Sequence, residues 1–74
     1  MTKEEAIREA LSSVEINKTE VSDSCGYIEH MINYKNYEEA VSCCFRLVEG
    51  AMALAVSLGA VCTLQSDKLD NLSN

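Results

Sequence analysis

The fold of this chain is decided by residues 36–65, NYEEAVSCCFRLVEGAMALAVSLGAVCTLQ. The stretch contains no proline, and Asn36 followed by Glu39 is the capping-box pattern that starts a helix. After Glu49, no charged residue occurs before Asp67. We therefore expect one long helix over about residues 37–65, more apolar than a helix with a single neighbour needs to be.

Two parallel seams run along this expected helix at the alternating spacing of four and three that places side chains on one face. The first seam consists of Tyr37, Val41, Cys44, Val48, Ala51, Ala55, Leu58, Cys62 and Gln65. The second seam consists of Ala40, Cys43, Leu47, Gly50, Leu54, Ser57, Val61 and Leu64. One neighbouring helix needs one seam, so two seams predict neighbours on two sides.

The residues before this stretch predict two shorter helices. Thr2 and Glu5 form another capping-box pattern, which predicts a helix over residues 3–15. A polar link at 16–19 separates it from an expected helix at 20–34, in which Gly26 marks either a close helix crossing or a break. The sequence therefore predicts an all-α fold: a three-helix bundle with two short helices and one long C-terminal helix. A single domain covers 1–65, and 66–74 form a polar tail.

A chain of 74 residues lies near the lower size limit for a stable core, and only 5% of its residues are aromatic. Two short helices cannot cover the long helix on all sides. We therefore expect a helical-bundle homo-oligomer, a homodimer or a tetramer, built from the long helix. The expected interface residues are Ala51, Leu54, Ala55, Leu58, Val61 and Cys62.

No pattern in the sequence predicts catalysis, so we expect no enzyme. The four cysteines, Cys25, Cys43, Cys44 and Cys62, contain no CxxC pair, and His30 is the one histidine, so neither a metal site nor a cofactor is expected. The charged N-terminus lacks the apolar core of a signal peptide, which favours a cytoplasmic location and free thiols. Cys44 and Cys62 are five helical turns apart on the first seam, and we expect both in the core.

The net charge of −6 disfavours direct contact with nucleic acid and with anionic membranes. We expect a small acidic protein-interaction module, such as an adaptor, a regulator or a phage-type inhibitor, which binds another protein as a homo-oligomer. Candidate partner-binding residues are Tyr27, Tyr34 and Tyr37, since tyrosine is favoured at interface hot spots. One alternative is an acidic nucleic-acid mimic that occupies a basic groove. Another is a small membrane-associated helical protein, although the uncharged residues 50–66 only just reach the length of a bilayer crossing.

Two short stretches resemble motifs of known families. Residues 36–41 resemble the start of the second helix of a tetratricopeptide repeat, which implies a helical hairpin that binds protein, but Leu47 stands where the repeat has Ala. Residues 66–70 are similar to the Ser-x-x-Leu-Asp motif of small helical phosphatases that act on aspartyl-phosphate in sporulation regulators. The Gln and Glu of that motif are missing here. Neither resemblance assigns the chain to a family.

Overall fold

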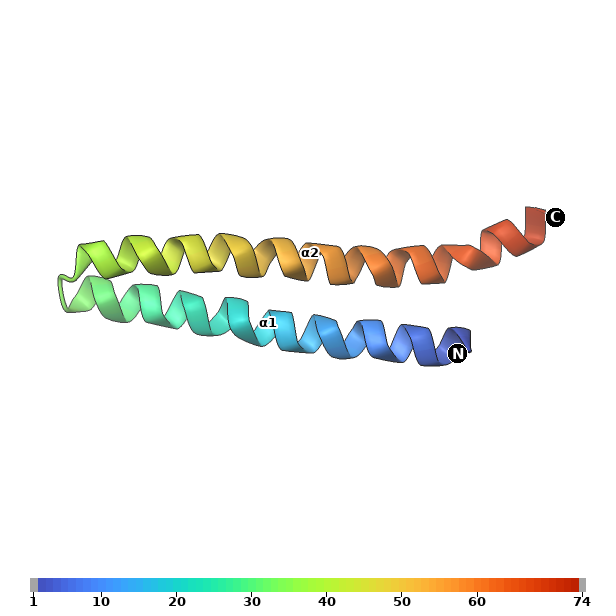
Figure 1. Ribbon diagram of the computed structural model, residues 1–74, viewed down its shortest axis with the longest axis horizontal. Coiled ribbons are helices and arrows are strands. Elements are labelled where there is room, and N and C mark those ends of the chain that lie inside the picture. Colours follow the sequence, from blue (N-terminus) through green and yellow to red (C-terminus); the bar gives the residue numbers. More distant parts are fainter. Residues whose placement is uncertain (1, 74) are drawn as a thin grey trace.

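The computed structural model describes residues 2–73, with side-chain surroundings given as far as Ser66. It consists of two α-helices, α1 (Lys3–Asn33) and α2 (Tyr37–Ser73), which lie side by side and antiparallel as a hairpin (Figure 1). The expected all-α fold is confirmed, but the three-helix bundle is wrong. The segments expected at 3–15 and 20–34 are one continuous helix, and the long helix begins at Tyr37 as expected but continues to Ser73.

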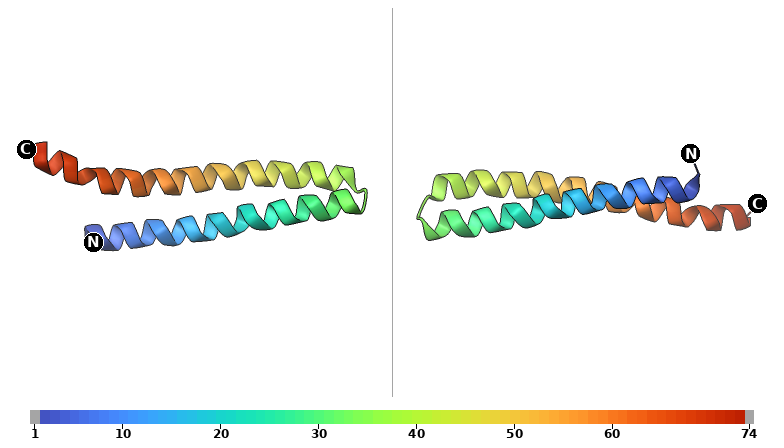
Figure 2. Two further views of the ribbon diagram at one scale, coloured as in Figure 1. Left: turned by 180° about the vertical axis from the view of Figure 1, so that it is seen from behind. Right: turned by 90° about the horizontal axis from the view of Figure 1, so that it is seen from below.

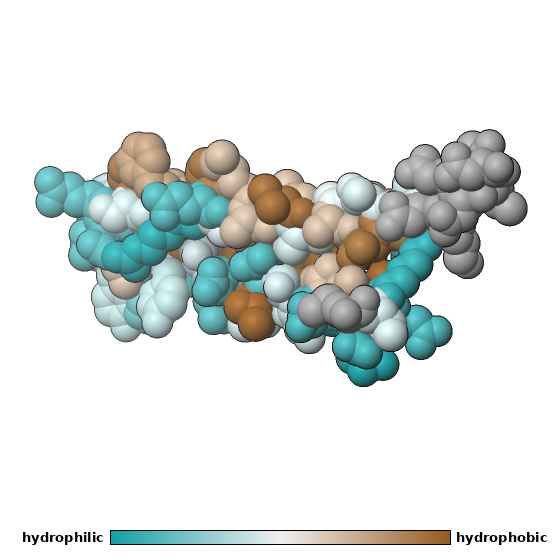
Figure 3. Space-filling view, turned by 45° about the vertical axis from the view of Figure 1, so that its right-hand side comes forward, coloured by the Kyte–Doolittle hydropathy of each residue, from teal (hydrophilic) through white to brown (hydrophobic). Residues whose placement is uncertain are grey.

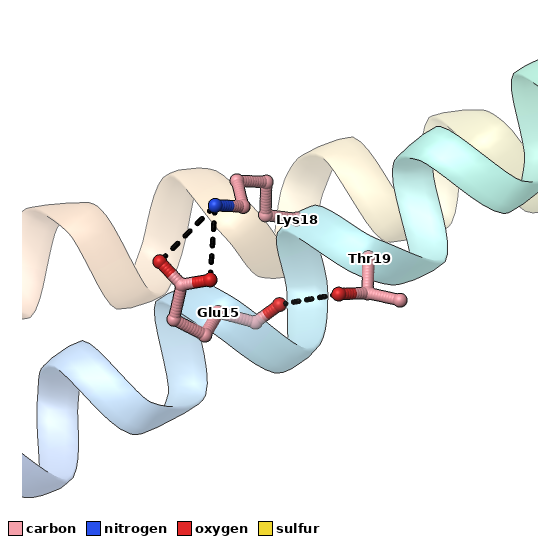
Figure 4. Close-up of polar contacts among 3 residues, drawn as sticks. All are labelled: Glu15, Lys18 and Thr19. Carbon is pink, nitrogen blue, oxygen red and sulfur yellow. Dashed lines mark hydrogen bonds and ion pairs between the residues drawn. The ribbon is translucent and has the colours of Figure 1, made fainter.

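The expected polar link at 16–19 is helical because its side chains bond within the helix or across the hairpin. The Lys18 ammonium lies 2.9 Å from a Glu15 carboxylate oxygen, and the Thr19 hydroxyl donates to the Glu15 carbonyl at 3.0 Å (Figure 4). These pairings have the i,i+3 and i,i+4 spacing of neighbours on a helix surface. The segment also contains no proline or glycine, so nothing in its backbone stops the helix.

One seam of half-buried residues runs along α1 at the alternating spacing of three and four. It passes through the expected link without a change of register, and its polar members, Asn17 and Ser24, obscure the pattern in the sequence. The seam consists of Ile7, Ala10, Val14, Asn17, Val21, Ser24, Ile28 and Met31.

The second seam of α2 faces α1. Ala40, Cys43, Gly50, Ser57 and Val61 are buried, and the three leucines of this seam are half-buried. The helices cross at a shallow angle. In the view from below, α2 lies above α1 near the turn and below it near the N-terminus (Figure 2). This winding is expected where helices pack along seams with a spacing of 3.5 residues.

Two contacts fix how the helices are aligned. The Asn17 Nδ2 donates to the Ala53 carbonyl at 3.3 Å and to the Ser57 hydroxyl at 3.2 Å, which forms a polar layer inside the apolar seam. A Cβ added at Gly50 would lie 3.3 Å from Val21 Cγ2, so the backbones approach closely there. Gly26, by contrast, has nothing within 4 Å of an added Cβ, so it marks neither a close crossing nor a break.

The turn between the helices closes α1 with a Schellman motif. The Asn36 N–H donates to the Met31 carbonyl at 2.8 Å and the Lys35 N–H to the Ile32 carbonyl at 3.0 Å, with Lys35 at φ 60°. Asn36 then caps α2, because its Oδ1 accepts from the Glu39 N–H at 3.3 Å. At the start of α1, Thr2 Oγ1 accepts from the Glu5 N–H at 3.1 Å. Both predicted N-caps are confirmed.

The hairpin is elongated and measures 59 × 19 × 14 Å. Its radius of gyration is 17.0 Å, whereas a compact domain of this length has a radius of about 11 Å. Much of each helix surface therefore faces outward.

Candidate functional site

The first seam of α2 has no neighbour in the hairpin. Its large side chains are exposed, at 60% for Tyr37, 55% for Val41 and for Val48, and 45% for Leu58. Phe45, Met52 and Val56 are also exposed on this helix, outside the two seams. In the space-filling view, apolar residues follow α2 while hydrophilic residues dominate along α1 (Figure 3). The candidate site is therefore this uncovered apolar strip along one helix.

The orientation of the first seam follows from its position in the sequence. From Val41 onward, each residue of the first seam directly follows a residue of the second seam. Successive residues of an α-helix are rotated by about 100°, so the two seams point nearly at right angles. α2 thus packs on α1 with its second seam, and its first seam points nearly at right angles to that contact. Helices at the corners of a four-helix bundle have two neighbours in this relation.

The structure divides the six residues expected at the oligomer interface. Ala51, Ala55, Leu58 and Cys62 belong to the first seam and are exposed. The other two, Leu54 and Val61, belong to the second seam; Leu54 is half-buried and Val61 is buried against α1. The four residues of the first seam are the ones left accessible to another molecule.

The three candidate tyrosines are exposed but do not form one patch. Tyr34 caps the end of α1, where its ring centroid lies 4.6 Å from that of His30. Tyr37 begins α2 on the first seam. Tyr27 lines a groove on another side of the hairpin together with Arg46 and Glu49. Four of the residues that line this groove are charged (Glu20, Asp23, Arg46 and Glu49), whereas the first seam carries no charge from Tyr37 to Gln65.

The cysteines differ in their surroundings. Cys43 is buried between the helices, while Cys25, Cys44 and Cys62 are exposed. The expectation that Cys44 and Cys62 lie in the core is therefore wrong for the hairpin, because α1 packs against the second seam and not the first. All four thiols are free, and within the described part of the chain no cluster of His, Cys, Asp or Glu could hold a metal ion.

Between Tyr37 and Ser66, α2 is long and apolar enough to cross a membrane. In the most apolar part of this segment, only 11% of the residues are buried in the hairpin. The core helix of a soluble protein has a similar composition but is mostly covered by its neighbours. α1 does not cover α2 to this extent.

Comparison of the chain with protein-family models, curated proteins and solved structures finds no match. The helix lengths also differ from those of a tetratricopeptide repeat, because α1 has 31 residues and α2 has 37, whereas a whole repeat of two helices has about 34. Of the phosphatase-like motif, only the Ser66 side chain lies within the described part, and its hydroxyl donates to the Cys62 carbonyl at 2.9 Å. The side chains of residues 67–70 lie outside it.

Proposed function

We propose that this protein is a small acidic protein-interaction module that assembles with copies of itself through the first seam of α2 and acts by binding another protein. The observation that carries the proposal is the length of this seam. Its exposed side chains extend from Tyr37, next to the turn, to Cys62, with small residues at the centre. A second copy provides an equally apolar surface for it to pack against.

The exposed area of the hairpin supports self-assembly. The chain exposes 5698 Å², whereas a compact monomer of this mass exposes about 4,500 Å². The excess of roughly 1,200 Å² is larger than the ~800 Å² that each partner buries in a stable interface of standard size. One dimer contact of standard size would therefore remove about two thirds of the excess exposed area of each chain.

The thin interior of the hairpin leads to the same conclusion. No described side chain is fully buried, and every residue of α1 keeps part of its surface exposed. The buried apolar side chains are Ala40, Cys43 and Val61, which are small or medium in size. Hydrophobic burial of this extent does not offset the conformational entropy of ordering two long helices. A second chain against the first seam would supply the missing burial.

The surface proposed for the partner protein is the outer side of α1, where five of the seven acidic residues of this helix lie, all of them exposed. They are Glu5, Glu9, Glu15, Asp23 and Glu29. A basic surface on the partner would complement them, and the same arrangement is what a nucleic-acid mimic needs. Tyr34 at the end of α1 adds an exposed aromatic residue. Binding through this surface weakens as salt rises, because solvent-exposed charges are screened.

The test of self-assembly is the mass in solution of the native chain and two matched variants, by light scattering at micromolar concentration. We expect the native chain at twice its 8.1 kDa or a higher multiple. Leu58→Asp places a charge on the first seam and should reduce the mass to that of a monomer. Ile16→Asp places the same charge on α1, where Ile16 is 62% exposed, and should leave the mass unchanged. A native chain of 8.1 kDa would refute the proposal.

Membrane association is the second candidate, and the length and apolar character of residues 37–66 favour it. To cross a bilayer, α2 would have to leave α1 outside, because seven acidic and three basic groups lie between Lys3 and Asn33. Recovery in the soluble fraction without detergent, and no co-sedimentation with lipid vesicles, would exclude this candidate. A soluble assembly in the cytoplasm is the first candidate because it keeps the hairpin intact.

A further inference from the structure

We propose that two copies of α2 pack antiparallel along their first seams, with a twofold axis beside Ala53. This inference rests on the self-assembly proposed above and specifies its orientation and register. In this register Ala51 faces Ala55 of the partner subunit, and Val48 faces Leu58 of the partner subunit. Farther out, Cys44 faces Cys62 of the partner subunit, and Val41 faces Gln65 of the partner subunit.

The first seam itself suggests the antiparallel arrangement, because its residue sizes are similar when read from either end. From the centre outward, one half contains Ala51, Val48 and Cys44, and the other contains Ala55, Leu58 and Cys62. Reversing one copy therefore places small side chains opposite small ones and branched side chains opposite branched ones. The two central alanine layers permit close approach of the helices, and every side chain from Val41 to Gln65 has a counterpart.

Phe45 and Gly59, which flank the first seam, distinguish the antiparallel arrangement from the parallel one. Phe45 is 68% exposed, and nothing lies within 4 Å of a Cβ added at Gly59. In the antiparallel register Phe45 lies beside Gly59 of the partner subunit, where the ring fills the open space. In a parallel pair the Phe45 residues of the two copies would lie on opposite edges of the contact, and neither ring would lie beside Gly59 of the partner subunit.

The charge distribution along α2 also favours the antiparallel arrangement. From Tyr37 to Glu49, α2 carries three acidic residues, Glu38, Glu39 and Glu49, against one basic residue, Arg46, and from Gly50 to Ser66 there is no charge. A parallel pair would place the two acidic halves side by side, where like charges repel. An antiparallel pair places each acidic half beside an uncharged one and aligns opposite ends of the helix dipoles.

The native cysteines test the orientation without new side chains on the seam. In the Cys25→Ser/Cys43→Ala variant, Cys44 and Cys62 remain, and we expect oxidation with copper phenanthroline to link two chains. A link within one chain is excluded, because these residues lie about 27 Å apart along a straight helix. Two controls also lack Cys62 (Cys62→Ala) or Cys44 (Cys44→Ala). Neither should form a linked dimer, because identical positions in the two copies then lie about 27 Å apart.

The outcomes separate this inference from the proposal on which it rests. Linked dimers from either single-cysteine control would show a parallel pair and overturn the antiparallel arrangement, while self-assembly would stand. No link in any variant, together with a doubled mass under reducing conditions, would overturn the register alone. No link together with a mass of 8.1 kDa would overturn both proposals. Unchanged helicity and mass of each reduced variant verify that the substitutions preserve the fold.

A second pair of variants tests the contact between Phe45 and Gly59 of the partner subunit. Gly59→Leu fills the space proposed for the phenyl ring and should weaken dimerisation at least tenfold. Gly26→Leu makes the same change at a glycine of α1 that is equally open, and should leave dimerisation unchanged. Equal dimerisation by the two variants would overturn the proposed register.

Discussion

The polar layer formed by Asn17 and Ser57 is the interaction between α1 and α2 whose energy can be tested most directly. The Asn17 side chain makes two hydrogen bonds across the hairpin, at 3.3 Å to the Ala53 carbonyl and at 3.2 Å to the Ser57 hydroxyl. A hydrogen bond between neutral groups contributes about 0.5–1.5 kcal/mol to stability, and these bonds are longer than the usual length of about 2.9–3.0 Å. We therefore assign each one to the lower half of that range.

Asn17→Ala removes both bonds, but Ala is a better helix former than Asn by up to about 0.7 kcal/mol, so the free energy of unfolding should fall by roughly 0.5–1.5 kcal/mol. Ser57→Ala removes the bond between the two side chains, together with the bonds that the Ser57 hydroxyl donates to the Ala53 and Leu54 carbonyls of its own helix at 3.1 and 3.0 Å. Ala is also a better helix former than Ser by up to about 0.5 kcal/mol, so the net loss should be near zero to 0.5 kcal/mol. The double variant should then be more stable than the sum of the single effects predicts, by a coupling energy of about 0.5–1 kcal/mol.

The assay is urea unfolding followed by circular dichroism at 222 nm. All variants are compared at one protein concentration, because self-assembly makes stability depend on concentration. The control cycle combines Asn17→Ala with Ser42→Ala, a serine that is exposed near the start of α2. Its two effects should be additive. A coupling energy between Asn17 and Ser57 below about 0.3 kcal/mol would refute the polar layer as the structure describes it.

The remaining predictions concern single residues, measured by the same unfolding assay. Gly26→Ala should stabilise the protein by about 0.5–1 kcal/mol, because Gly26 is inside α1 with open space at its Cβ position. Gly50→Ala should lack that gain, because the new Cβ would lie 3.3 Å from Val21 Cγ2, a tight contact that the Val21 side chain would have to relieve by moving; equal gains at both sites would contradict the close approach. Lys35→Gly should stabilise by up to about 1 kcal/mol, because Lys35 has φ 60° and only glycine adopts this conformation without steric cost. A loss of stability at Lys35 would contradict the Schellman motif.

Much of the helical structure could be predicted from local sequence signals. Thr2 and Asn36 cap the two helices, and the hydrogen bonds from Glu5 and Glu39 that the capping pattern requires are present. The seam of α1 was equally present in the sequence, at constant spacing from Ile7 to Met31. Asn17 and Ser24 concealed it, because polar residues on a seam resemble a link when the partner that bonds to them is unknown.

The six residues expected at the oligomer interface fall on two different faces of α2. Ala51, Ala55, Leu58 and Cys62 are exposed, as an assembly surface requires, whereas Leu54 and Val61 pack toward α1. From the sequence, all the expected interface residues lay in the second half of the long helix, between Ala51 and Cys62. In the structure the difference lies between two faces of α2 and not between its two halves. The second seam faces α1 over the length of the contact, and the first seam is exposed.

The sequence by itself determined the helices, their caps and the two seams of α2, because each depends on residues close together in the chain. Only the tertiary structure decided which seam packs inside the hairpin. The first seam is as apolar as the second, so burial alone does not distinguish them. The choice depends on matches between distant residues: Gly50 leaves room for Val21, and Ser57 accepts a hydrogen bond from Asn17. Such matches are properties of pairs of residues, which the pattern of one helix cannot show.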